Sequence, residues 1–135
     1  MTTYGTLGAV QKLRYEDLTK EIIGAAIEVH KVVGPGLLEG IYEECLCHER
    51  QLRKLSFDRQ VIVPVIYKGV TLDCGHRQDL LVEDTVILEL KSVDRIHPIF
   101  EAQLLTYMRM LQKPVGLLIN FNVPVLRSGI VRRVI

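Results

Sequence analysis

The sequence predicts one domain of mixed α/β (α+β) class, in which helices pack on a mixed β-sheet. The chain has 135 residues, 48% of them hydrophobic, which is enough for one buried core and too little for two full domains. Apolar residues recur at helical spacing in the first third of the chain and at alternate positions in the middle. The predicted order is helix, helix, three strands, helix, strand, strand.

Two amphipathic helices are expected first. After an N-terminal tail at residues 1–15, a helix is expected over 16–33 and ends at the Gly-Pro-Gly turn of 34–36. A second helix is expected over about 37–54. Its expected inner face consists of Leu38, Ile41, Tyr42, Cys45 and Leu52. Because the connecting turn is short, the two helices must pack against each other. Residues 16–135 are therefore expected to form the single domain.

Strands are expected from Phe57 onward. Residues 61–66 are apolar at every position, which predicts a strand covered on both faces. Pro64 within this run indicates a sheet edge or a bulge. After a turn at 67–70, the later elements are expected as strands at 71–82 and 86–93, a helix from His97-Pro98 to Leu111, and strands at 115–121 and 129–135.

Composition excludes several classes of protein. The formal net charge of +1 supplies no field that would attract polyanions, so contact with nucleic acid would come from local clusters of Lys and Arg. No apolar run reaches the roughly 18 residues that span a bilayer, and residues 1–18 lack the pattern of a signal peptide, so the expected compartment is the cytoplasm. Cys45, Cys47 and Cys74 cannot form an even disulfide framework and are expected to be reduced residues at packing or surface positions.

The most informative segment is a predicted hairpin. A three-residue loop at 83–85 joins two strands and pairs Val82 with Val86. Counting outward from that pair, Asp79 lies opposite Glu89. Cross-strand neighbours on one face are about 5 Å apart at Cβ, and like charges there are destabilising. A divalent cation would compensate for this repulsion.

Lys91 completes a group of three charges. It lies two residues beyond Glu89 and therefore on the same face of the strand. Two carboxylates with the backbone carbonyl of Leu90 form an oxygen ligand set suited to Mg²⁺ or Mn²⁺. A cation and a lysine beside it are the parts that metal-assisted phosphodiester hydrolysis uses. Considered alone, the same pattern is also compatible with a surface hairpin whose charges form ordinary salt bridges.

Two further motifs accompany the hairpin. Residues 36–42 read Gly-Leu-Leu-Glu-Gly-Ile-Tyr and place Glu39 and Tyr42 three apart on a helix, and Gln103 and Tyr107 lie four apart on a later helix. Together with the hairpin charges, these motifs closely resemble the GxxExxY proteins of the PD-(D/E)XK nuclease superfamily. The resemblance extends from about Leu18 to Val134 and implies a restriction-endonuclease-like core.

The resemblance also implies roles for single residues. Asp79 and Glu89 would bind the metal ion directly, Glu39 would help to hold it or its water, and Lys91 would be the catalytic lysine. The side chains that would position substrate or water are Gln103, Tyr107, Tyr42 and His30. Each has a plainer interpretation: a helix-dipole acid for Glu39, packing for Tyr42, a structural histidine for His30, and hydrogen bonds at the sheet edge for Gln103 and Tyr107. Asn120 and Asn122 would either satisfy backbone groups or reach the site.

Three functional hypotheses follow. The first is a nuclease dependent on Mg²⁺ (or Mn²⁺) that acts on DNA or RNA, with DNA favoured. The alternative is a non-catalytic module that keeps the nuclease fold and binds nucleic acid or protein. A third hypothesis is a regulatory or toxin-related protein that associates with itself as a homodimer. The basic residues that would contact phosphate, or else form solvated faces, are Lys12 with Arg14, Arg50 with Arg53 and Lys54, and Arg127 with Arg132 and Arg133.

Overall fold

The computed structural model describes residues 4–135, with side chains described from Tyr15 onward. The helices are α1 (Tyr4–Val33), α2 (Glu39–Leu52) and α3 (Pro98–Leu111), with a short 3-10 helix, η1, at Leu126–Gly129. The strands are β1 (Phe57–Ile62), β2 (Val65–Tyr67), β3 (Val70–Leu72), β4 (Arg77–Val82), β5 (Val86–Lys91), β6 (Val115–Asn120) and β7 (Ile130–Val134). This order confirms the predicted succession of elements and the mixed α/β class.

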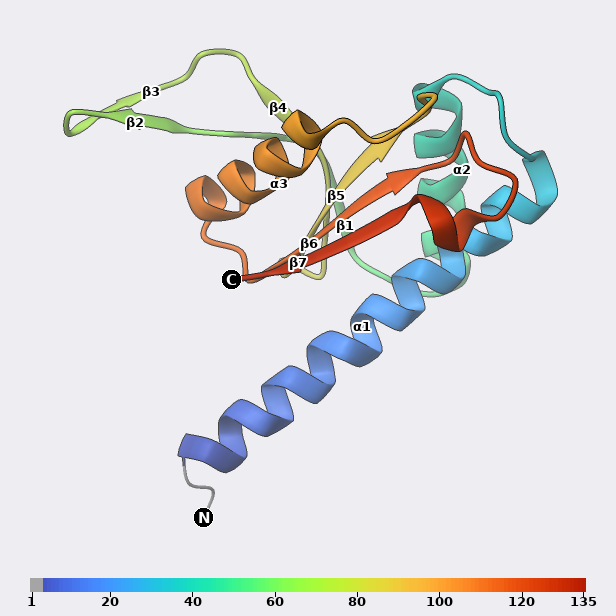
Figure 1. The fold of residues 1–135 in the computed structure, drawn as a ribbon. Coiled ribbons are helices and arrows are strands. Elements are labelled where there is room, and N and C mark those ends of the chain that lie inside the picture. Colours follow the sequence, from blue (N-terminus) through green and yellow to red (C-terminus); the bar gives the residue numbers. More distant parts are fainter. Residues whose placement is uncertain (1–3) are drawn as a thin grey trace.

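Five of the strands form one mixed sheet in the order β1-β4-β5-β6-β7 (Figure 1). The β5–β6 pair is parallel and the other pairs are antiparallel. Two parallel neighbours need a long crossover connection, and α3 provides it. β4 and β5 are therefore central strands, each paired on both sides.

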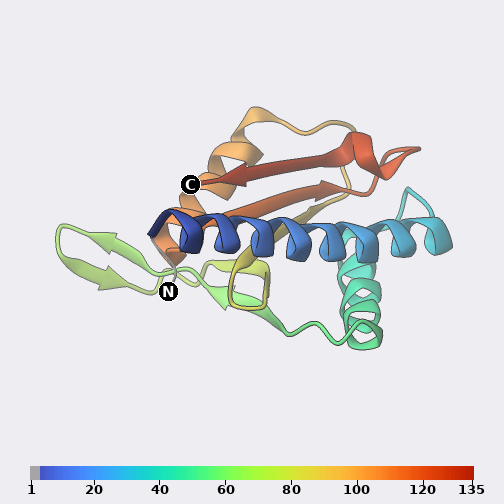
Figure 2. The ribbon, with the colours of Figure 1, turned by 90° about the horizontal axis from the view of Figure 1, so that it is seen from below.

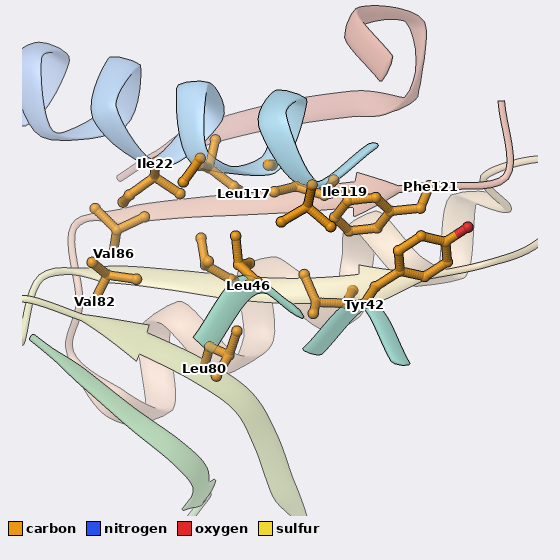
Figure 3. Packing of buried hydrophobic residues seen from close by; sticks show 14 of the residues in the cluster. Ile22, Tyr42, Leu46, Leu80, Val82, Val86, Leu117, Ile119 and Phe121 are labelled. Atoms are coloured by element: carbon orange, nitrogen blue, oxygen red, sulfur yellow. The ribbon is translucent and has the colours of Figure 1, made fainter. Parts of the chain in front are cut away.

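Helices cover both faces of the sheet. α1 and α2 pack on one face, where Ile22, Leu46 and Phe121 belong to a cluster of fully buried side chains (Figure 3). α3 packs on the other face through Leu104 and Met108. Because successive strand residues point to opposite faces, even-numbered residues of β4 and β5 face α1 and α2, and odd-numbered residues face α3. Asp79, Glu89 and Lys91 therefore share the α3 face.

Close approach of α3 to β6 requires a glycine. A Cβ atom added to Gly116 would lie 2.7 Å from Sδ of Met108 and 2.9 Å from Cδ1 of Leu104. The missing side chain lets α3 pack directly on the sheet. The first turn of α3 lies over the end of β5, where Phe100 contacts Lys91.

The helices differ from prediction in two respects. α1 begins at Tyr4 and not at residue 16, so residues 4–15, expected in a tail, are helical. The predicted inner face of α2 was partly wrong, because Leu38, Ile41 and Leu52 are exposed. Leu38 and Leu52 lie at the two ends of α2, beyond the part that packs on the core. The buried residues of this helix are Tyr42, Leu46 and Cys47, while Cys45 is half-buried.

The predicted two-sided burial of residues 61–66 was wrong. β1 is an edge strand, as Pro64 indicated, and the chain leaves the sheet there to form a separate β2–β3 hairpin that projects from the domain (Figure 2). Ile62 and Ile66 are consequently 47% and 68% exposed. The expected strand at 71–82 is likewise divided into β3 and β4. No helix within residues 4–135 combines the length and the apolar content that crossing a bilayer requires.

Candidate functional site

The β4–β5 hairpin has the register that its turn predicted. Val82 is paired with Val86, and the regular ladder continues to Leu80 and Leu88. Continuing the register by one residue places Asp79 opposite Glu89. The two acids therefore lie side by side at the end of the hairpin that is remote from the turn.

The backbone ladder opens at these two acids. The N–H of Asp79 donates to Oε1 of Glu89 at 3.3 Å, and the N–H of Leu90 donates to Oδ2 of Asp79 at 2.9 Å. In a regular antiparallel pair, such amides bond to carbonyls of the opposite strand. Here carboxylate oxygens take the place of those carbonyls. The N–H and C=O of one strand residue point toward the same neighbour, so the Leu90 carbonyl faces the same opening.

Burial and mutual repulsion disfavour the charged forms of both acids. Glu89 is 8% exposed, and burial, followed by the charge of Asp79, raises its pKa from 4.5 to about 8. Burial also raises the pKa of Asp79, while the hydrogen bond from Leu90 lowers it. Two carboxyl groups that share a desolvated site are stabilised as anions by a positive charge between them. The pair is thus arranged to accept a cation.

Lys91 lies near the acids without pairing with them. Its Nζ lies 4.4 Å from the centroid of the Phe100 ring, in a cation–π contact. Its charge lowers the pKa of both Asp79 and Glu89, so the ammonium is within electrostatic range of the pair. In the part of the chain with described side chains, neither acid forms an ion pair. Lys91 likewise has no carboxylate partner among the described side chains.

The loop before α2 brings Glu39 to the same end of the sheet. Ser92, the residue after β5, donates its hydroxyl to the Leu37 carbonyl at 2.6 Å. The Tyr42 hydroxyl accepts from the N–H of Leu37 at 3.2 Å and donates to the Gly34 carbonyl at 2.6 Å. Glu39 is the first residue of α2 and is exposed. Its charge contributes to the raised pKa of Asp79, which shows that it lies within range of the site.

Glu43, one turn further along α2, was missed by sequence reasoning. Its charge raises the pKa of Asp79 more than that of Glu39 does. Two consecutive residues of β1 hold it: Arg59 Nη2 at 2.7 Å and Gln60 Nε2 at 3.0 Å. Neighbours in a regular strand point to opposite faces. Gln60 has a φ of 52° and interrupts the β1–β4 pairing opposite Asp79, which allows both side chains to reach one glutamate.

α3 brings Tyr107 to the acids. Tyr107 is 8% exposed, and burial, then the charges of Glu89 and Asp79, raises its pKa. Gln103 lies one helical turn earlier on the same side of α3 and is exposed. The predicted pair of side chains thus occupies the face of α3 that begins at Phe100, above Lys91, and continues toward the acids.

Three other predicted residues hold the loops around the site. His30 Nε2 bonds to the Val123 carbonyl at 2.8 Å, and the Tyr42 ring stacks on Phe121 at 4.3 Å. Asn120 accepts from the N–H of Val93 and donates to its carbonyl, both at 3.0 Å. The structure therefore does not bring His30 or the Tyr42 hydroxyl to the carboxylates. The sequence left two roles open for Asn120, and the structure shows that its side chain satisfies backbone groups of Val93.

Gln78 is a second polar residue that sequence reasoning missed. It is fully buried, and its Nε2 donates to the carbonyls of Leu80 and Leu88, both at 2.6 Å. These bonds link β4 to β5 just inside the opening. The sequence did offer a signal for Gln78, because it is a polar residue at a core-facing position of an apolar strand, next to Asp79.

The basic clusters are in part committed to internal pairs. Arg53 pairs with Glu49 at 2.8 Å and with Glu21 at 3.2 Å, and Arg133 pairs with Glu101 at 3.2 Å. The side chains of Lys12 and Arg14 lie outside the described residues, and Arg127 is exposed. Lys54 and Arg127 are exposed and form no ion pair among the described side chains.

The residues at the opening fit a hard divalent cation. Carboxylate and carbonyl oxygens are the donors that Mg²⁺ and Mn²⁺ prefer, and Mg²⁺ commonly uses only one or two protein carboxylates, with water completing its shell. Among the described residues, no group of three His, Cys, Asp or Glu side chains is arranged around one metal position. Asp79, Glu89 and the Leu90 carbonyl are oxygen donors that could hold such a cation together with water.

Comparison with known proteins identifies a family for the chain. The model of the PD-(D/E)XK nuclease superfamily matches residues 16–134. Curated proteins and solved structures give no significant match. The resemblance to GxxExxY proteins is finer than this match and stays a prediction.

Proposed function

The chain belongs to the PD-(D/E)XK nuclease superfamily, and from that premise we propose that it is a nuclease that hydrolyses phosphodiester bonds in DNA or RNA with Mg²⁺ or Mn²⁺. One observation carries the proposal. Asp79 and Glu89, two acids of central strands, converge where the β4–β5 ladder opens, with Lys91 beside them on the same face. Burying such a pair in its charged form is unfavourable unless a proton or a cation joins it.

The proposed roles follow from position. Asp79, Glu89 and the Leu90 carbonyl hold the cation, which, when bound, supplies Lewis-acid activation of water and phosphate. Lys91 contributes a positive charge near the scissile phosphate, where negative charge increases in the transition state. Glu39, at the exposed start of α2, would help to hold the cation or its water.

α3 forms the wall of the site on which substrate is positioned. Tyr107 presents a hydroxyl close to the acids, and Gln103 presents an exposed amide one turn away. A phenol and an amide can each donate to phosphate oxygens. Tyr42 and His30 act indirectly, because their polar atoms already hold the loops at residues 34–37 and 121–125.

The experiment is a cleavage assay with plasmid DNA, single-stranded DNA and RNA, in Mg²⁺, in Mn²⁺ and in EDTA. Asp79→Asn and Lys91→Met remove one charge each from the site. The matched controls are Asp84→Asn and Lys113→Met, because Asp84 in the turn of the hairpin and Lys113 after α3 form an ion pair 2.8 Å apart at the turn end. Melting curves of all four variants report whether each one folds.

Metal-dependent cleavage that is lost in both site variants and kept in both controls supports the proposal. Cleavage that survives Asp79→Asn contradicts the assignment of the site. Binding of nucleic acid without cleavage by the wild type, in either metal, contradicts the enzyme and favours the non-catalytic module. Gel filtration of the same samples tests the homodimer.

A further inference from the structure

The loop before β4 carries a histidine that has no place in the predicted site. Gly75 adopts a φ of 74°, and its N–H donates to Oδ1 of Asp73 at 2.9 Å, which tightens the turn between β3 and β4. The next residue, His76, is anchored through its backbone, because its carbonyl accepts from the N–H of Val63 at 3.1 Å. This fixed loop directs the His76 ring toward α3.

His76 contacts Tyr107 in two ways. Nε2 of the imidazole and the Tyr107 hydroxyl share a hydrogen bond. The two rings also lie 5.0 Å apart at their centroids, tilted by 37°. The contact joins two elements that are far apart in the sequence, one at the base of the β2–β3 hairpin and one on α3.

Tyr107 in turn belongs to the same cluster of buried side chains as Leu81 and Ile87, which lie two residues from Asp79 and Glu89 on the same face of β4 and β5. The charges of Glu89 and Asp79 both contribute to its raised pKa, after burial. Its hydroxyl therefore bonds to His76 and stays within electrostatic range of both carboxylates. A phenol hydroxyl hydrogen rotates about its C–O bond to suit its partners, so the bond to His76 limits where that hydrogen, or the remaining lone pair, points.

The exposure of His76 and Tyr107 differs, and this difference indicates that His76 does more than pack against the core. His76 is exposed, whereas Tyr107 is buried. An exposed ring on a loop that other bonds already hold adds little to the stability of the core. Its effect falls mainly on the direction of the Tyr107 hydroxyl.

We propose that His76 is a positioning residue of the candidate nuclease site, which holds the Tyr107 hydroxyl toward the phosphate or water bound at Asp79 and Glu89. The phosphate or water that Tyr107 would contact rests on the proposed function. The contact between His76 and Tyr107 does not depend on it. Reacting groups lose much of their rate when a positioning group moves by even 1 Å or so.

Three variants separate the hydrogen bond from the ring contact. His76→Phe keeps an aromatic ring and removes the polar atom, His76→Gln keeps a polar nitrogen at similar reach, and Tyr107→Phe removes the hydroxyl itself. We expect His76→Phe to lower kcat by about tenfold with KM within about twofold. His76→Gln restores most of kcat. The double variant, with both residues changed to Phe, loses no more than Tyr107→Phe alone, because the two residues act as one unit.

A second measurement needs neither cleavage nor metal. In protein with ¹³C-labelled tyrosine in EDTA, the Tyr107 Cζ resonance, assigned by its loss in Tyr107→Phe, should shift in His76→Phe and return toward the wild-type position in His76→Gln. An unchanged resonance in His76→Phe overturns the proposal, and so does an unchanged kcat or a multiplicative loss in the double variant. If the wild type cleaves nothing, the proposed function fails, while the resonance still decides whether His76 orients Tyr107.

Discussion

The two ends of the β4–β5 hairpin both carry acidic residues, but these residues are exposed at one end and buried at the other. At the turn end, Asp84 is 81% exposed and pairs with Lys113 at 2.8 Å. At the open end, Glu89 is 8% exposed and lies against Asp79 without an ion pair in the described part of the chain. At the turn end the strands are fully paired through Val82 and Val86, and at the open end carboxylates replace backbone acceptors.

Within this one hairpin, the turn end contributes to stability and the open end carries the candidate chemical groups. The turn end leaves its charges in water and buries only apolar side chains, which is the arrangement that stabilises a fold. The open end buries like charges side by side, which opposes folding unless protons or a cation are bound. Perturbed carboxyl groups gather at functional sites for this reason.

Glu89→Gln should show the largest effect, and it depends on pH. The pKa of Glu89 is raised to about 8 in the folded protein, above its ordinary 4.5, so the folded chain keeps a proton that the unfolded chain releases. The wild type therefore has this stability in full below pH 4.5 and loses it as the pH rises toward 8. A neutral glutamine has no such loss. In EDTA at pH 8, we expect the variant to be more stable by at most roughly 4 kcal/mol.

Urea denaturation of both proteins in EDTA at pH 5 and at pH 8 measures this effect. The difference between wild type and Glu89→Gln should be much larger at pH 8. An equal difference at the two pH values would show that the raised pKa of Glu89 is not a property of the folded protein.

Leu88→Ala should show the next largest effect, with the opposite sign. Leu88 is fully buried, next to Glu89 in sequence but on the α1 and α2 face of the sheet. Its truncation should cost about 3 kcal/mol of unfolding free energy through the cavity that it leaves. The affinity for Mn²⁺, measured by titration calorimetry, should stay close to that of the wild type. A large loss of affinity would mean that the two faces of β5 are not independent.

Mg²⁺ should stabilise the wild type at pH 8 and not the site variants. A ligand that binds only the folded state at a hundredfold its Kd contributes about 2.7 kcal/mol. Thermal melting with Mg²⁺ and with EDTA should therefore show a higher Tm for the wild type and no change for Asp79→Asn. The control Asp84→Asn should respond like the wild type, and an equal response of all three proteins would place the cation elsewhere.

Asp84→Asn should have the smallest effect. The Asp84 side chain is 81% exposed and that of its partner Lys113 is 20% exposed, and ion pairs at the surface contribute about 1 kcal/mol or less. The free energy of unfolding of the wild type and of Asp84→Asn, with and without 1 M salt, measures this contribution. Salt at that concentration screens exposed charges, so the difference between the two proteins should shrink. A loss of several kcal/mol would erase the contrast between the two ends of the hairpin.

Local patterns were sufficient to predict most of the fold. The alternation of apolar residues and the three-residue loop at 83–85 predicted the pairing of Val82 with Val86, which the structure confirms. The same register led to the prediction that Asp79 and Glu89 lie together. The boundary errors arose where burial depends on distant neighbours. The exposed Ile62 and Ile66 are the example, because sequence alone does not show that a strand ends a sheet.

The surroundings of the acids were less predictable. Gln60 adopts a left-handed backbone that no local signal marks, and Arg59 and Gln60 both donate hydrogen bonds to Glu43 on a separate element. The contact of His76 with Tyr107 joins residues 31 positions apart. Each of these features depends on a hydrogen bond between separate elements, which residue spacing within one element cannot reveal.

The sequence by itself determined the class of fold, the register of the β4–β5 hairpin and the presence of two acids and a lysine on one strand face. These properties depend on turn length and on the two-residue period of a strand, which are local. Only the tertiary structure decided that the ladder opens at Asp79, that Glu89 is buried, and that α2 and α3 bring Glu39 and Tyr107 to the opening. Desolvation and electrostatic range depend on how whole elements pack, and packing is a property of the complete fold.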